Sequence, residues 1–331
     1  MFDHKYKRIV LSLSFLLVMP FFLWGADRIT GVYSFTSGST LPLWVAQEAG
    51  LFKKYNLEAL LVSVQGSARG AQALLSGDAD VAALGGEVVV LSALKGGSMK
   101  IFAGMVDVFP STIFAAKNIT RPDQLKGKKI AISTFGSSSD FSVRYALRKF
   151  GLNPDKDVTI LQIGNQPNRF AALTSGAVDA TIINPPLTLE AKRMGYQPLV
   201  DLAATGLQYP QAELASVPGY MKSHEDVMRR LVRAYTESLY LIHTQKAASQ
   251  KSLQKFMKMN DPQVIEETIE SYRNYFPRKP YPSAQALRFV IDYLGEKQPA
   301  IRNLNPENLL EPRFVRELDE SGFIDQLYRQ R

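Results

Sequence analysis

The chain has no cysteine and only three histidines among its 331 residues. The absence of cysteine excludes a disulfide scaffold, an iron–sulfur cluster, a thiolate zinc site, a cysteine nucleophile and a lipid-anchored lipoprotein start. His4, His224 and His243 offer little basis for a metal cluster or a histidine-based catalytic relay. The sequence also has no P-loop, no HExxH motif and no nucleophile–base–acid constellation. We therefore predict no metal, no cofactor and no catalytic residue.

Concentrated charge is also missing. The formal net charge is +8, yet no run of five or more like charges and no basic stripe interleaved with aromatics occurs after the N-terminus. Nucleic-acid binding is therefore disfavoured. The chain is 46% hydrophobic and 21% charged, which is typical of a globular protein with a sizeable core. At about 150 residues per domain, its length predicts about two domains.

The N-terminus has the composition of a secretory signal peptide. Lys5, Lys7 and Arg8 precede an apolar run at 9–24, which is followed by Gly25 and Ala26. That run is shorter than the roughly 20 residues needed to span a bilayer. We interpret residues 1–25 as a signal peptide and predict a periplasmic protein. An uncleaved membrane anchor is the alternative, because Leu23 and Trp24 are poor residues at the −3 position of a cleavage site.

The rest of the first third alternates between strand-like and helix-like segments. Patterns typical of strands occur at 29–35, 57–64 and 81–84, and helical spacing occurs at 43–54 and from 71 onward. Such βαβαβ alternation predicts a parallel sheet with helices on both faces.

The same pattern returns about 100 residues later. The string Ala73-Leu74-x-Ser76-Gly77-x-x-Asp80 recurs as Ala172-Leu173-x-Ser175-Gly176-x-x-Asp179, at an offset of 99. Gly50-Leu51 and Gly151-Leu152 are related by an offset of 101. Although any two α/β units reuse glycine and serine in turns, the full repeated string favours two structurally equivalent lobes.

Two facing lobes would enclose a cleft lined by the loops that follow their strands, because ligands bind outside the carboxyl ends of parallel strands. These loops are rich in hydroxyls and amides, and several lie where a helix begins, a position that receives anionic groups well. For any single residue a helix-capping role is the simpler explanation. The predicted ligand-binding residues are Phe35, Ser37, Gly38, Ser39, Thr40, Gln65, Gly66, Ser67, Gly86, Glu87, Phe135, Gly136, Ser137, Ser138, Ser139, Asn165 and Asn184.

Several segments resemble one known family. The segment 40–55, TLPLWVAQEAGLFKKY, is similar to the first-helix signature of nitrate/sulfonate/bicarbonate-type substrate-binding proteins of ABC transporters, a family that also includes thiamine-pyrimidine binders. The resemblance continues through 73–80, 123–132, 135–141 and 176–186. The family's pyrimidine synthases need a cysteine-rich motif, which this chain lacks.

The resemblance implies a two-lobed periplasmic-binding-protein type II fold of α/β class, with a mainly parallel sheet in each lobe and a helical C-terminal region. We expect lobe 1 at 26–112, lobe 2 at 113–205, and a return to lobe 1 with C-terminal helices at 206–331. The candidate crossover strands are Ile113–Ala116 and Leu214–Val217. C-terminal helices are expected from a capping sequence at 223–226, from Asp261-Pro262, and at about 283–297 and 312–329.

The implied function is capture of a small polar or anionic molecule by a monomer that delivers it to an ABC importer permease, and so indirectly to its ATPase. A sensor or delivery module is the alternative, followed by an enzyme on the same fold. Asp140 and Arg144 are expected to form a structural helical pair, and Asp80 and Asp179 to fix turns. Arg69 and Arg169 could pair with an anion, but we expect each to lie at the surface.

Overall fold

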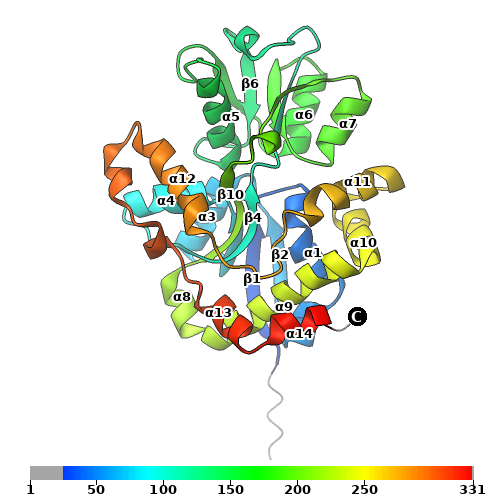
Figure 1. Ribbon diagram of the computed structural model, residues 1–331, viewed down its shortest axis with the longest axis vertical. Coiled ribbons are helices and arrows are strands. Elements are labelled where there is room, and N and C mark those ends of the chain that lie inside the picture. Colours follow the sequence, from blue (N-terminus) through cyan, green and yellow to red (C-terminus); the bar gives the residue numbers. More distant parts are fainter. Residues whose placement is uncertain (1–24, 330–331) are drawn as a thin grey trace, which may run out of the picture.

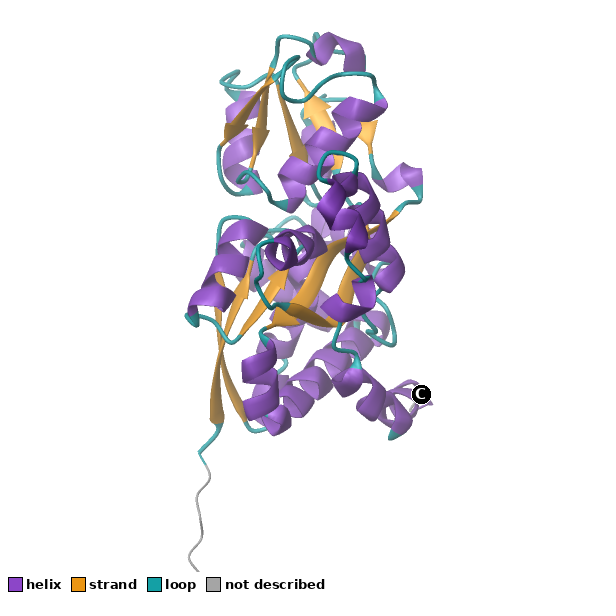
Figure 2. Ribbon diagram, turned by 90° about the vertical axis from the view of Figure 1, so that its left-hand side faces the viewer, coloured by secondary structure: helices purple, strands orange, loops and turns teal. Residues whose placement is uncertain are grey.

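The computed structural model describes residues 25–329, and it has two lobes stacked along its long axis (Figure 1). The predicted apolar N-terminal run and the basic residues before it lie outside the described residues. Each lobe contains a five-stranded sheet with helices on both faces (Figure 2). The first sheet has the order β2-β1-β3-β10-β4 and the second has the order β7-β6-β8-β5-β9.

The first sheet consists of β1 (Asp27–Tyr33), β2 (Leu57–Ser63), β3 (Val81–Leu84), β4 (Lys100–Val108) and β10 (Gln208–Ser216). The second sheet consists of β5 (Thr112–Ala115), β6 (Lys129–Ile132), β7 (Thr159–Gln162), β8 (Ala180–Ile183) and β9 (Pro198–Asp201). In each sheet four strands run in one direction, and the fifth, β10 or β5, runs antiparallel to both of its neighbours. The two-lobed fold predicted from the sequence is confirmed, with mixed rather than purely parallel sheets.

The helices of the N-terminal part are α1 (Leu41–Glu48), α2 (Leu51–Lys54), α3 (Ser67–Ser76) and α4 (Gly86–Leu94). The second lobe contains α5 (Ser138–Lys149), α6 (Gln166–Thr174) and α7 (Leu187–Arg193). The C-terminal part contains α8 (Pro218–Ser223), α9 (Glu225–Thr244), α10 (Lys246–Met257), α11 (Pro262–Arg273), α12 (Ala284–Gly295), α13 (Arg313–Glu320) and α14 (Phe323–Arg329). No helix within 25–329 combines the length and the apolarity that a bilayer crossing requires.

The repeat seen in the sequence has a structural counterpart at the strand starts. Asp80 Oδ2 accepts a hydrogen bond from the Thr30 backbone N–H at 2.7 Å, and Asp179 Oδ2 accepts one from the Lys129 N–H at 2.8 Å. Each aspartate immediately precedes a strand, β3 or β8, and accepts from the backbone of the neighbouring parallel strand, β1 or β6. The two aspartates are therefore structurally equivalent, as the repeat predicted, but they hold an adjacent strand rather than the expected turn.

The chain crosses between the lobes at 109–111 and 202–207, which connect strands of different sheets. The predicted crossover segments 113–116 and 214–217 instead lie mostly inside β5 and β10, because their apolar side chains are buried on both faces of a sheet. Phe109 and Tyr209, one beside each passage, stack with ring centroids 4.0 Å apart. A single apolar core continues across both lobes at this point.

Two further local expectations differ from the structure. The predicted helix at 43–54 is divided into α1 and α2, because Gly50 has a φ of +70° that ends the first helix. Ser223 does not cap α9: its hydroxyl donates to the backbone oxygens of Gly219 and Tyr220, inside the preceding α8. By contrast, Asp261 caps α11 as expected, by accepting from the backbone N–H groups of Gln263 and Val264.

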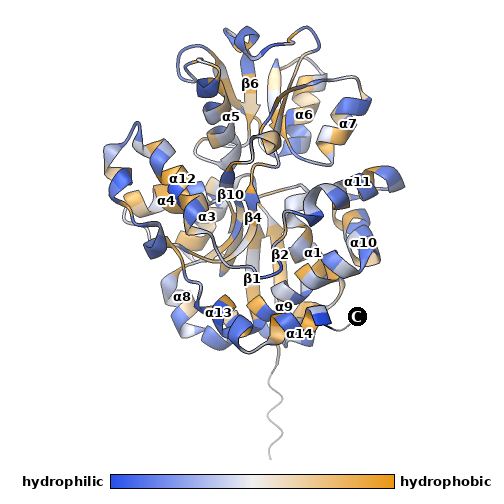
Figure 3. Ribbon diagram, viewed as in Figure 1, coloured by the Kyte–Doolittle hydropathy of each residue, from blue (hydrophilic) through white to orange (hydrophobic). Residues whose placement is uncertain are grey.

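The core of the first lobe packs beneath its sheet against the C-terminal helices. The face of α9 formed by Leu231, Tyr235 and Leu239 is almost completely buried. Tyr272 and Phe276 of α11 belong to the same core. Apolar residues accordingly concentrate along the strands and the inward helix faces, and polar residues on the outer helix faces (Figure 3). This packing places the strand-to-helix loops of both lobes opposite one another.

Candidate functional site

A polar cavity lies between the lobes at the ends of the parallel strands. It leaves about 50 Å³ for the centres of water-sized spheres, and one water needs roughly 10–15 Å³ by this measure. The space therefore suits a few waters or one small polar group. The lining residues are Ser34, Phe35, Thr36, Ser37, Gly66, Ser67, Ser111, Ser133, Ser137, Ser138, Ser139, Asn165, Gln166, Arg169, Ile182, Asn184 and Gln211.

Three helices of nine or more residues begin at this cavity. They are α3 at Ser67, α5 at Ser138 and α6 at Gln166. The first residues of a helix have unpaired backbone N–H groups and a partial positive charge. Because these ends come from both lobes, a negatively charged group in the cavity would be stabilised from two sides.

Arg169 is the charged residue of the lining, and it is only 6% exposed. Its guanidinium donates to the backbone oxygens of Gly164 at 2.6 Å and Ile182 at 3.0 Å. Burial lowers the pKa of Arg169 to about 9, so the group remains cationic at neutral pH. No described carboxylate is within ion-pair distance of it, and its Nε has no hydrogen-bond partner in the described protein. A buried cation of this kind favours an anionic ligand.

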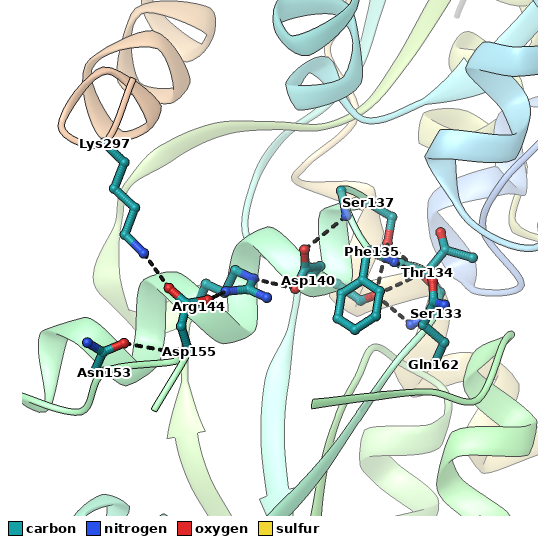
Figure 4. Close-up of polar contacts among 12 residues, drawn as sticks. Ser133, Thr134, Phe135, Ser137, Asp140, Arg144, Asn153, Asp155, Gln162 and Lys297 are labelled. Atoms are coloured by element: carbon teal, nitrogen blue, oxygen red, sulfur yellow. Dashed lines mark hydrogen bonds and ion pairs between the residues drawn. The ribbon is translucent and has the colours of Figure 1, made fainter. Parts of the chain in front are cut away.

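Hydroxyl groups fill much of the second lobe's side of the cavity. Ser133 Oγ lies 2.7 Å from Ser137 Oγ and 2.8 Å from Ser139 Oγ. In addition, Asp140 Oδ2 accepts from the Gly136 backbone N–H at 2.9 Å and pairs with Arg144, as Figure 4 shows. The expected Asp140–Arg144 pair thus exists and holds the loop that carries these serines.

Gln166 joins the lobes directly at the cavity. Its Nε2 donates to the backbone oxygen of Thr36 in the first lobe at 2.9 Å, and its Oε1 accepts from the Asn184 N–H at 2.9 Å. The backbone N–H of Gly38 also donates to the oxygen of Pro185. These contacts describe a conformation in which the two lobes are closed on the cavity.

The structure brings part of the predicted residue set to the cavity. Among the predicted residues, those that line it are Phe35, Ser37, Gly66, Ser67, Ser137, Ser138, Ser139, Asn165 and Asn184. Those that do not are Gly38, Ser39, Thr40, Gln65, Gly86, Glu87, Phe135 and Gly136.

Four of the predicted residues that do not line the cavity show where such side chains lie instead. Ser39 is fully buried and donates to the Tyr272 hydroxyl at 3.3 Å, and Thr40 donates to the Phe35 oxygen. Phe135 is 49% exposed. Glu87 is buried behind Ser138, which donates to its carboxylate.

Eight further residues line the cavity but were not in the predicted set: Ser34, Thr36, Ser111, Ser133, Gln166, Arg169, Ile182 and Gln211. Of these, Arg169 was named only as a residue that could pair with an anion. The expectation that Arg169 lies at the surface is wrong, whereas Arg69 is exposed as expected. The signal for Arg169 was its position four residues after Asn165, which places both on one face of α6. Among the described residues, no group of three or more histidine, aspartate or glutamate side chains is placed to hold a metal ion.

Two lobes closed around a polar cavity define the class of the periplasmic binding proteins. Residues 38–248 match the family described as NMT1/THI5 like, and the chain belongs to that family. A Bacillus subtilis (strain 168) protein named "Putative binding protein YtlA" is 24% identical over 269 residues, 77% of this chain and 80% of that protein.

Solved structures share the fold. The alkanesulfonate-binding protein SsuA from Xanthomonas axonopodis pv. citri, bound to MOPS, is 21% identical with a TM-score of 0.71, over 86% of this chain and 98% of SsuA. The periplasmic nitrate-binding protein NrtA from Synechocystis PCC 6803 is 16% identical with a TM-score of 0.71, over 89% of each chain.

Proposed function

We propose that this protein is an extracytoplasmic solute-binding protein that encloses a small anion between its lobes and delivers it to the permease of an ABC importer. The observation that carries the proposal is Arg169, a buried cation at the cavity. The helix N-termini and serine hydroxyls around it supply hydrogen-bond donors, and the lining contains no described carboxylate. A buried cation surrounded by hydrogen-bond donors, with no carboxylate in the lining, suits an oxyanion such as nitrate or the head group of a sulfonate.

The names of similar proteins support this class of function. SsuA is named for alkanesulfonate binding, and NrtA is named as a periplasmic nitrate-binding protein. The binding residues proposed here are the nine predicted residues that line the cavity, together with Arg169 and Gln166. The cavity's small volume indicates that any organic tail of the ligand would extend from the closed site or hold the lobes further apart.

The first experiment is calorimetry and thermal unfolding with nitrate, sulfate, ethanesulfonate and MOPS, with choline as a cationic control. A ligand at about 100 times its dissociation constant stabilises the folded state by roughly 2.7 kcal/mol, so at least one anion should raise the melting temperature and choline should not. The proposal fails if none of the four anions binds.

A matched pair of arginine variants tests the site. Arg169→Met removes the buried cation, and Arg69→Met removes the exposed arginine near the corresponding position of lobe 1. Losing a charged hydrogen bond costs about 1.5–3 kcal/mol, or roughly ten- to a hundredfold in affinity. We expect that loss for Arg169→Met and unchanged affinity for Arg69→Met. Equal anion affinities for the two variants would mean that Arg169 does not contribute to binding.

Delivery to a permease is tested in cells. A strain without this protein should lose uptake of the radiolabelled anion that the purified protein binds, and plasmid-borne protein should restore it. Unchanged uptake with an altered transcriptional response would indicate the sensor role instead. Mass spectrometry of the ligand after incubation should return it unchanged, and conversion to a product would indicate an enzyme.

A further inference from the structure

Glu87 connects the two lobes directly behind the cavity. It lies in the first turn of α4 in the first lobe and is 1% exposed. Its Oε1 accepts from the hydroxyl of Ser138, the first residue of α5 in the second lobe, at 2.8 Å. Its Oε2 accepts from the Tyr209 hydroxyl of β10, also at 2.8 Å. The carboxyl group is therefore one contact away from the cavity, through Ser138.

The surroundings of Glu87 contain hydroxyls and other acids rather than a cation. Within the described residues no lysine, arginine or histidine pairs with it, and burial raises its pKa to about 7. Tyr209 of β10 donates to it, and Glu213 also lies on β10. Burial holds the pKa values of Tyr209, of Glu213 and of Asp107 on β4 above their ordinary values. The charges of Asp107 and of Glu87 both raise the pKa of Glu213 further. On the cavity side α3 and α5 present the hydroxyls of Ser67 and Ser138 to Glu87.

The ionisation state of Glu87 decides where the Ser138 hydrogen points. A carboxylate only accepts hydrogen bonds, so ionised Glu87 takes the Ser138 hydrogen and leaves the serine's lone pairs facing the cavity. A protonated carboxyl has one O–H donor. That donor can be given to Ser138 Oγ while the other carboxyl oxygen still accepts from Tyr209. Ser138 is then free to donate its hydrogen into the cavity.

Ser67 extends the same relationship to the first lobe. Its Oγ accepts from the Gly85 backbone N–H at 3.0 Å and lies 3.2 Å from Ser138 Oγ. When Ser138 donates to Glu87, Ser67 is the group that can donate to Ser138. When Glu87 is protonated, both serine hydrogens become available to an anion. The neutral acid also removes a negative charge from behind the cavity.

We propose that an anion enters the cavity together with a proton that binds to Glu87, so that ligand binding and protonation of this carboxyl favour one another. The proposal rests on the anion-binding function proposed above and goes beyond it, because it makes Glu87 a positioning residue that controls the donors of the site. By linkage, the proton raises the affinity for the anion as much as the anion raises the affinity for the proton. Affinity should then fall by about tenfold per pH unit above the pKa of free Glu87.

Calorimetry of the wild-type protein with ethanesulfonate tests the proposal directly. Titrations near pH 6 are run in bis-Tris and in imidazole, two cationic buffers of different ionisation enthalpy. Titrations near pH 8 are run in Tris and in a second cationic buffer whose ionisation enthalpy differs from that of Tris. The dependence of the heat on the buffer gives the number of protons taken up. We expect nearly one proton per anion near pH 8 and almost none near pH 6.

Two glutamine variants assign the proton. Glu87→Gln mimics the protonated acid, because its amide can donate to Ser138 and accept from Tyr209, so it should bind the anion with no proton uptake and little pH dependence between about pH 6 and 8. Glu213→Gln alters a neighbouring buried acid that does not contact Ser138, and it should keep the wild-type proton uptake. Thermal unfolding confirms that each variant is folded.

The outcomes separate this proposal from the function on which it rests. Binding of ethanesulfonate without proton uptake by the wild-type protein overturns the proposal and leaves the binding function intact. Uptake that persists in Glu87→Gln assigns the proton to another group and likewise overturns it. If ethanesulfonate, nitrate, sulfate and MOPS all fail to bind, the binding function is itself wrong and the linkage falls with it.

Discussion

Lys297, which follows α12 in the first lobe, forms an ion pair with Asp155 of the second lobe, with a distance of 2.5 Å from Nζ to Oδ2. Asp155 also pairs with Arg144, and Arg144 Nε lies 2.6 Å from Asp140 Oδ1. Because Asp140 accepts from the Gly136 N–H, a chain of charges connects the C-terminal region to the loop that carries the cavity serines (Figure 4). The ion pair between Lys297 and Asp155 is thus linked, through Arg144 and Asp140, to the loop at the cavity.

We predict that Asp155 contributes to stability only while it is ionised. The hydrogen bonds from Lys297 and Arg144 lower its pKa from 3.8 to about 2. A carboxylate with a lowered pKa in the folded state stabilises that state above its ordinary pKa, and the contribution is lost as the pH falls from about 4 towards 2. The pair is half exposed, so we expect less than about 1 kcal/mol. Urea unfolding of Asp155→Asn should show a flatter pH dependence in this window.

Lys297→Ala provides the control for this prediction. If the ion pair across the lobes is responsible, Lys297→Ala should remove part of the same acid-dependent stability, and the double variant should lose no more than Asp155→Asn alone. High salt should reduce the difference further. An Asp155→Asn protein with the acid profile of the wild type would mean that the pair contributes nothing.

Local sequence patterns were sufficient for the parts of this fold that depend on neighbouring residues. The repeated string ending at Asp80 and Asp179 predicted structurally equivalent lobes, and each aspartate accepts from the backbone of an adjacent strand in its own lobe. The loops around Ser37 and Ser138 were predicted as parts of the cavity because strand ends of a parallel sheet meet at one edge. Both serines line the cavity.

Side-chain directions that depend on distant packing were not predictable. Ser39 was predicted to bind the ligand, as Ser138 was, yet it faces Tyr272, which is 233 residues away in the sequence. Arg169 was expected at the surface, since nothing local shows that it donates to the carbonyls of Gly164 and Ile182. Such contacts depend on how α6 and α11 pack, and a single sequence does not give that information.

Variants of Asp261 and Arg193 distinguish the stability contributed by a helix cap from that contributed by an ion pair between the lobes. Asp261 caps α11 and also pairs with Arg193 of α7, with a distance of 2.7 Å from Nη1 to Oδ2. Loss of an N-cap costs about 1 kcal/mol, whereas an exposed ion pair contributes less. Urea unfolding should show that Asp261→Ala lowers the free energy of unfolding by about 1 kcal/mol, and Arg193→Ala by clearly less. Equal losses would assign the effect to the ion pair.

Leucine variants of Ser138 and Ser39 should differ in their effects, because Ser138 lines the cavity and Ser39 lies in the core. Ser138→Leu places a branched apolar group where a hydroxyl lines the cavity, so we expect affinity for the bound anion to fall roughly ten- to a hundredfold. Ser39→Leu overfills a buried site beside Tyr272, which costs about 1–3 kcal/mol of stability. Calorimetry on the folded fraction of Ser39→Leu should find an unchanged affinity for the anion. Comparable affinity losses in both variants would place Ser39 in the site as well.

Gly85 tests whether closure of the lobes is needed for tight binding. A Cβ atom at this position would lie 2.1 Å from Glu87 Oε2 and 2.2 Å from Ser138 Oγ. The Gly85 φ of −76° is open to alanine, so the conflict in Gly85→Ala is steric. The conflict with Glu87 lies within the first lobe, whereas the conflict with Ser138 opposes the closed conformation. Overfilling costs about 1–3 kcal/mol, and we expect anion affinity to fall roughly ten- to a hundredfold, with less compaction on ligand addition in small-angle scattering.

Gly219→Ala is the matched control, because a Cβ there meets no atom within 4 Å and the residue lies within α8. Alanine favours a helix more than glycine does, so this variant should be as stable as the wild type or slightly more stable. Its affinity and its compaction should be those of the wild type. If Gly85→Ala also binds as the wild type does, Glu87 and Ser138 can separate without loss of the ligand, and their contact does not contribute to closure.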